Sequence, residues 1–103
     1  MKESQAMQEL KKAAASNEPV IDIKIGEDDN NQVVIRVDRV QKDAKITSIV
    51  KDGVPLQKTE KEKREMLGFF LLTICLEAYE NGLAPEDRER LSTLMVIFDV
   101  KSR

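Results

Sequence analysis

The segment from Met66 to Leu76, MLGFFLLTICL, carries no charged residue, although 35% of the chain is Asp, Glu, Lys or Arg. An α-helix rises about 1.5 Å per residue, so this segment would extend roughly 16 Å, against about 30 Å for the hydrocarbon core of a bilayer. Charged segments flank it on both sides, and a longer span would have to bring them into lipid. We therefore expect other protein surfaces, and not a membrane, to cover this segment.

The residues around this segment predict one long helix. Thr59 followed three positions later by Glu62 has the spacing of a capping box, and Gly82 suits a left-handed helix end. Over 59–81, a helical wheel leaves an apolar arc of about 260°, whereas a surface helix needs only somewhat more than about 100°. One packing partner cannot cover so wide an arc. The residues that interrupt it, and that we expect to face water, are Glu62, Met66, Thr73, Glu77 and Glu80.

Upstream of this helix, apolar residues recur at every second position, which is typical of strands with one buried face. Two such runs flank the loop GEDDNNQ at 26–32, and a third, KITSIVK at 45–51, stops at the turn dipeptide Asp52-Gly53. Pro55 disfavours a further central strand. We therefore expect a three-stranded antiparallel β-meander. The alternating residues of the first two strands are Ile21, Ile23, Ile25, Val33, Ile35 and Val37.

The two ends of the chain allow alternatives. Residues 1–18 have helix-forming composition but a narrow apolar face, so they predict either a short helix or a flexible arm. Pro85 suits the first turn of a C-terminal helix. The end of that helix, LMVIFDV at 94–100, alternates well enough to be an edge strand, and both readings stay open. Together these elements predict an α+β fold, with residues 19–103 forming a single domain.

Several kinds of chemistry are disfavoured by the composition. The chain has no His and one Cys, which removes Ser-His and Cys-His nucleophile pairs, imidazole zinc sites and an intramolecular disulfide. We expect Cys75 to be a small buried hydrophobe, and the acidic loop at 27–31 to be a solvated hairpin tip and not a calcium site. The prediction is therefore a non-enzymatic protein without metal or cofactor. It is also expected to be cytoplasmic, since the N-terminus lacks the apolar region of a secretory signal.

The wide apolar arc favours a protein–protein interaction module, such as an adaptor, an inhibitor or a chaperone-like factor. We expect it to form a homodimer through helix 59–81, because dimers with two-fold symmetry are the commonest oligomers, and to bind a further protein. The residues predicted to form the interface are Leu67, Phe70, Leu71, Ile74, Cys75 and Ala78.

The alternative hypothesis is a nucleic-acid-associated regulatory protein that uses basic residues of the strand region. It ranks second because the formal net charge is -2, and because these strands have no aromatic residues on which bases could stack. The residues that would carry this function are Arg36, Arg39, Lys42 and Lys45.

Overall fold

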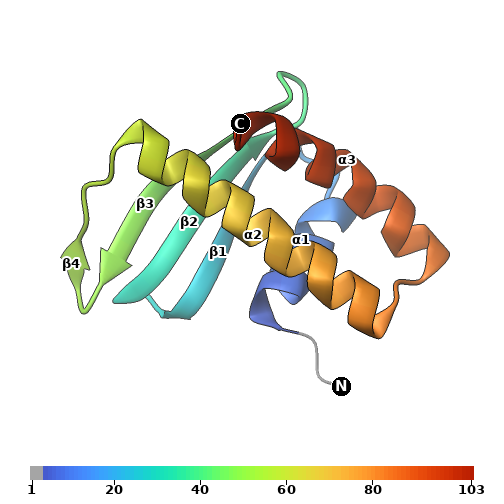
Figure 1. The fold of residues 1–103 in the computed structure, drawn as a ribbon, viewed down its shortest axis with the longest axis horizontal. Helices are drawn as coiled ribbons and strands as arrows, with labels where there is room; N and C mark the ends of the chain where they lie inside the picture. Colours follow the sequence, from blue (N-terminus) through green and yellow to red (C-terminus); the bar gives the residue numbers. More distant parts are fainter. Residues whose placement is uncertain (1–3) are drawn as a thin grey trace.

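An antiparallel sheet and a layer of helices on one of its faces make up the computed structural model, which describes residues 4–103 (Figure 1). This arrangement confirms the predicted α+β fold, with a long helix after the strands. In chain order the elements are α1 (Gln5–Ala15), β1 (Val20–Asp28), β2 (Asn31–Asp38), β3 (Asp43–Lys51), β4 (Val54–Pro55), α2 (Glu60–Asn81) and α3 (Pro85–Lys101).

The strands pair in the order β1-β2-β3-β4, with every neighbouring pair antiparallel. Ile35 of β2 lies opposite both Ile23 of β1 and Ile46 of β3, so one apolar row crosses three strands on the inner face. The predicted meander gains a fourth strand, β4, which is only two residues long. Pro55 is accommodated there because β4 lies at the edge of the sheet.

The turn between β1 and β2 is tighter than the loop expected at 26–32. The strands continue to Asp28 and resume at Asn31. The Asp28 carboxylate accepts hydrogen bonds from the backbone N–H groups of Asn30 at 2.8 Å and Asn31 at 3.1 Å. Such side-chain bonds to the following backbone stabilise turns, so this carboxylate is engaged in shaping the hairpin.

One apolar core lies between the inner face of the sheet and the helices. α1 contributes Met7, Leu10 and Ala13, each at most 5% exposed. The narrow apolar face of this segment is therefore packed against the core. The remaining core residues are Ile23, Ile35, Val37, Ala44, Ile46, Ile49, Leu67, Ile74, Leu91, Leu94, Ile97 and Phe98.

Polar contacts hold both ends of α1 in place. At its N-terminus, Ser4 donates from its backbone N and its Oγ to the two carboxylate oxygens of Glu77 in α2, at 2.6 and 2.5 Å. At its C-terminus, the guanidinium of Arg39 donates to the backbone oxygens of Ala13 and Ser16. Residues 5–15 thus form a docked helix, in agreement with the first of the two alternatives for the N-terminal region.

The C-terminal segment is helical throughout α3. Leu94, Ile97 and Phe98 are each at most 3% exposed, because the spacing of a helix brings all three onto its inner side. The edge-strand alternative for 94–100 is therefore wrong. Within residues 4–103, no helix has the length and apolar character needed to cross a membrane.

Candidate protein-binding surface on the long helix

α2 begins and ends where the local sequence predicts. The Thr59 Oγ accepts from the backbone N–H of Glu62, and the Glu62 carboxylate accepts from the backbone N–H of Thr59, both at 3.1 Å. That backbone bond holds the pKa of Glu62 below its ordinary value, because it favours the charged carboxylate. At the other end Gly82 has a φ of 71° and donates to the oxygen of Ala78 at 2.8 Å.

The inner side of α2 is packed by its own domain. Leu67 and Ile74, seven positions apart, are 3% and 0% exposed. The ring of Phe70 meets that of Phe98 edge to face, with centroids 5.4 Å apart. Gly68 lies where α2 passes the end of α3, since a Cβ placed on it would be 3.4 Å from the Cβ of Ser102. The sheet and α3 therefore cover part of the wide apolar arc.

The outer side of α2 carries large apolar residues that nothing within residues 4–103 covers. Phe69, Leu72, Leu76 and Tyr79 are 72%, 54%, 54% and 88% exposed, and we call these four residues the outer stripe. At about 100° per residue they fall within roughly 80° of the helix circumference, so they form a continuous row. Contiguous exposed apolar surface of this kind marks interaction sites on water-soluble proteins.

The interface predicted from the sequence and the outer stripe are different sets of residues. Leu67 and Ile74 belong to the core, whereas the half-buried Phe70, Leu71 and Ala78 pack against it. Only the sixth member, Cys75, is exposed, so the expectation that its thiol is buried is wrong. Cys75 lies beside the outer stripe on the helical wheel.

The difference arises from how α2 is rotated about its axis. We expected Glu62, Met66, Thr73, Glu77 and Glu80 to mark the side facing water. Glu62, Thr73 and Glu80 are exposed as expected, whereas Met66 faces a groove above the sheet and Glu77 bonds to Ser4 at the start of α1. The outer stripe is offset from that polar row by roughly 80° on the wheel. No signal within α2 locates the outer stripe, because the buried and half-buried Leu67, Phe70, Leu71 and Ile74 recur at the same three- and four-residue intervals.

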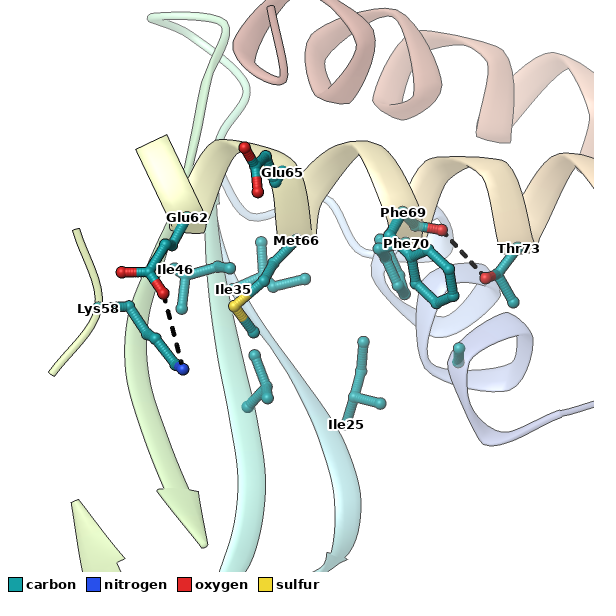
Figure 2. A pocket seen from close by; sticks show the side chains of 12 residues that line it. Ile25, Ile35, Ile46, Lys58, Glu62, Glu65, Met66, Phe69, Phe70 and Thr73 are labelled. Atoms are coloured by element: carbon teal, nitrogen blue, oxygen red, sulfur yellow. Dashed lines mark hydrogen bonds and ion pairs between the residues drawn. The ribbon is translucent and has the colours of Figure 1, made fainter. Parts of the chain in front are cut away.

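A groove of about 600 Å³ lies under the N-terminal half of α2 (Figure 2). Its floor is the inner face of the sheet and its wall is α2, with Phe69 shared between the groove and the outer stripe. Thr73 donates from its hydroxyl to the backbone oxygen of Phe69 at 3.0 Å. The residues that line the groove are Ala6, Ile25, Val33, Ile35, Ile46, Lys58, Glu62, Glu65, Met66, Phe69, Phe70 and Thr73.

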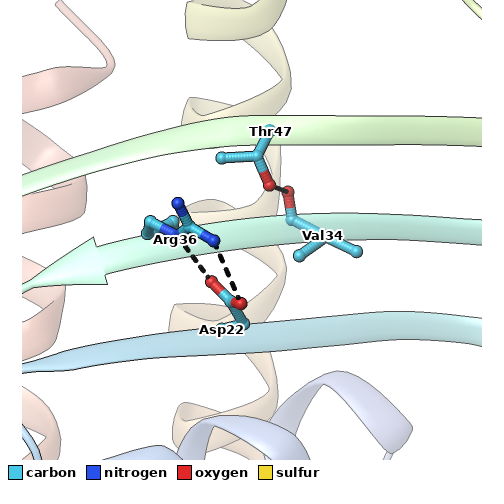
Figure 3. Close-up of polar contacts among 4 residues, drawn as sticks. All are labelled: Asp22, Val34, Arg36 and Thr47. Atoms are coloured by element: carbon cyan, nitrogen blue, oxygen red, sulfur yellow. Dashed lines mark hydrogen bonds and ion pairs between the residues drawn. The ribbon is translucent and has the colours of Figure 1, made fainter.

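The basic residues proposed for nucleic-acid binding do not form one free patch. On the outer face of the sheet, Arg36 donates to both carboxylate oxygens of Asp22, at 2.9 and 3.4 Å (Figure 3). This pairing lowers the pKa of Asp22 and raises that of Arg36. Arg39 is engaged with backbone oxygens at the end of α1, and Lys42 lies in a turn with a φ of 53°. Lys45, opposite Arg36 in the sheet, remains exposed.

Over residues 4–103, no three side chains of Cys, Asp or Glu gather in a way that could hold a metal ion. Comparison of the chain with protein-family models, curated proteins and solved structures finds no match. The candidate function therefore has to be argued from the exposed surfaces of this chain.

Proposed function

We propose that this protein is a non-enzymatic protein–protein interaction module that forms a homodimer through the outer stripe of α2. The observation that supports the proposal is the row of four large apolar side chains, each more than half exposed, on one side of one helix. Leaving such side chains in water forfeits most of the roughly 1.5–3 kcal/mol that full burial of each one contributes. A surface that covers this row gains that free energy.

The spacing of the outer stripe suits a second copy of the same chain. Its intervals of three, four and three residues read the same in both directions. In an antiparallel pair of α2 helices related by a two-fold axis, Phe69 would face Tyr79 of the second copy, and Leu72 would face its Leu76. Both pairs are centred on position 74, so a single two-fold axis at that position brings all four residues into contact with the second copy. The helix dipoles would also run antiparallel, which is favourable.

The strength of such a dimer follows from its size. Burying eight partly exposed side chains contributes on the order of 10 kcal/mol, and association costs about 4–15 kcal/mol in lost freedom of motion. With the smallest association cost about 6 kcal/mol remains, which corresponds to a dissociation constant of roughly tens of micromolar, so the dimer should form at high micromolar and not at nanomolar concentration. A reversible dimer of this strength suits a module that exchanges partners.

The first experiment measures the oligomeric state of the full chain. We expect sedimentation velocity to show a dimer at high micromolar concentration, and Leu76→Glu to convert it to a monomer, because a charge would be buried at the centre of the contact. Val96→Glu is the matched control: Val96 is 63% exposed but lies on α3, outside the stripe. If both variants behave like the unmodified chain, the outer stripe is not the interface.

The single cysteine provides a second test. Cys75 lies one residue from the proposed axis, so the two copies of Cys75 would be offset along the helices by only about 3 Å. A short bismaleimide should therefore link two chains efficiently, and Leu76→Glu should abolish the link. Monomers that capture an unrelated protein instead would point to a heterologous interface. Such an exposed thiol is compatible with a reducing compartment, and the proposal places the protein in the cytoplasm.

A further inference from the structure

The groove beneath α2 has the dimensions and lining of a small-molecule site. Its volume of about 600 Å³ falls within the range of about 300–1,000 Å³ that is usual for ligand pockets. At its base, Ile35 and Ile46 are 2% and 4% exposed, and the flanking Met66 and Phe70 are only half-buried. The surface that the groove presents to solvent is mostly apolar, so an apolar occupant that removes it from water is favoured.

Charged groups occur at one end of the groove only. There the ammonium of Lys58 lies 3.8 Å from the carboxylate of Glu62, which also accepts the capping bond from Thr59. Glu65, one turn along α2 from the capped end, lines the same end and forms no ion pair with another residue of the described chain (Figure 2). The three charged residues that line this end therefore sum to one negative charge, and the Glu65 carboxylate is not engaged in an ion pair with another described residue.

The dipole of α2 does not make this end of the groove favourable for an anion. The N-terminus of a helix attracts anions, but acidic residues already occupy the first turn of α2, at Glu60 and Glu62. The Thr59 hydroxyl also occupies one of the backbone N–H groups that an anion would need. An anionic ligand at this end would thus meet repulsion from Glu65 and find the helix terminus occupied.

We propose that the groove binds a small amphiphile with an apolar body and a cationic head. The body lies along the sheet against the partly exposed Ile25, Val33 and Met66, and the head lies beside the Glu65 carboxylate. An apolar pocket with a few polar groups at one position is the usual form of a small-molecule site, in which the polar groups fix the ligand's orientation. This site shares Phe69 with the proposed dimer contact but none of the other three residues of the outer stripe, and it goes beyond the proposed function.

The experiment compares three ligands with the same chain and different heads. The neutral dye Nile red, bound to the full-length protein, reports occupancy of the groove by its fluorescence. Decylamine, decanol and decanoate, each below its micellar concentration, then compete with the dye. We expect decylamine to displace the dye at roughly three- to tenfold lower concentration than decanoate, with decanol between them. The ratio is small because a pair of opposite charges exposed to water contributes little binding free energy.

Two substitutions test the assignment of the head and the body. Glu65→Lys should reverse the order of decylamine and decanoate, whereas Glu89→Lys, the same charge change on an exposed residue of α3, should preserve it. Ile25→Phe should fill part of the groove and weaken all three ligands, with circular dichroism confirming that the variant is folded.

A further variant separates the groove from the outer stripe. Leu72→Glu leaves the groove lining intact, so it should leave dye binding unchanged even when it disrupts the dimer. The proposal is overturned if the dye does not bind, if the three ligands compete equally, or if binding is lost in Leu72→Glu and retained in Ile25→Phe.

Discussion

The contact between Ser4 and Glu77 offers the sharpest test of how α1 is attached. One carboxylate accepts two hydrogen bonds, at 2.6 Å from the backbone N and 2.5 Å from the hydroxyl of Ser4. The same hydroxyl accepts from the backbone N–H of Met7 at 3.2 Å and so caps the helix. Glu77 thus joins α2 to the N-terminus of α1, where its negative charge also complements the helix dipole.

Removing this carboxylate should weaken the docking of α1 more than that of any other element. Hydrogen bonds to charged groups contribute about 1.5–3 kcal/mol, and partial exposure of this site reduces the figure, so we expect Glu77→Ala to cost about 2 kcal/mol. Glu77→Gln keeps one acceptor oxygen and should cost about 1 kcal/mol. For a domain of this size, each kcal/mol lowers Tm by roughly 4–8 °C.

Thermal unfolding and amide hydrogen exchange together measure this effect. Exchange should accelerate first in α1, because Met7, Leu10 and Ala13 lose the contact that keeps them against the core. Glu80→Ala, one turn along α2 on an exposed residue, is the control and should leave Tm nearly unchanged. The reasoning is refuted if the two alanine variants unfold at the same temperature, or if exchange accelerates equally in every element.

Two further predictions concern the rotation of α2 and the response to acid. Leu71→Glu should lower Tm far more than Thr73→Glu, because Leu71 packs against the core and Thr73 is exposed; equal melting temperatures would show that α2 is rotated differently. The pKa values of Asp22 and Glu62 are held below their ordinary values of 3.8 and 4.5, so both groups bind protons more weakly in the folded chain than in the unfolded one. Their contribution to stability is therefore present above those ordinary values and is lost as the pH falls below them through the folded pKa values. Urea unfolding between neutral and acidic pH should show this loss, and Asp22→Asn combined with Glu62→Gln should flatten the curve; an unchanged slope would contradict the assignment.

Much of the fold follows from local signals in the sequence. The capping pair Thr59 and Glu62, together with Gly82, sets the limits of α2 because each acts on backbone groups within a few residues. The alternation of apolar residues defines the inner face of the sheet in the same way. The segment 94–100 was ambiguous because its pattern satisfies both periods. Burial of Leu94, Ile97 and Phe98 against the rest of the domain decides in favour of the helix.

The candidate surface could not be predicted in the same manner. α2 is apolar on nearly every side, so its own sequence does not determine which side faces water. The positions of the sheet and α3 determine it, and they bury Leu67 and Ile74 while leaving Phe69 and Tyr79 outside. Similarly, Glu77 looks like a solvent-facing residue until a partner 73 positions away in the sequence, Ser4, is brought beside it.

The central claim is that the outer stripe of α2 joins two copies of this chain, and sedimentation velocity across the micromolar range tests it most directly. We predict a concentration-dependent shift from monomer to dimer in the unmodified chain, and a monomer at every concentration for Leu76→Glu. A chain that stays monomeric at high micromolar concentration, or a Leu76→Glu variant that dimerises as well as the unmodified chain, would contradict the account.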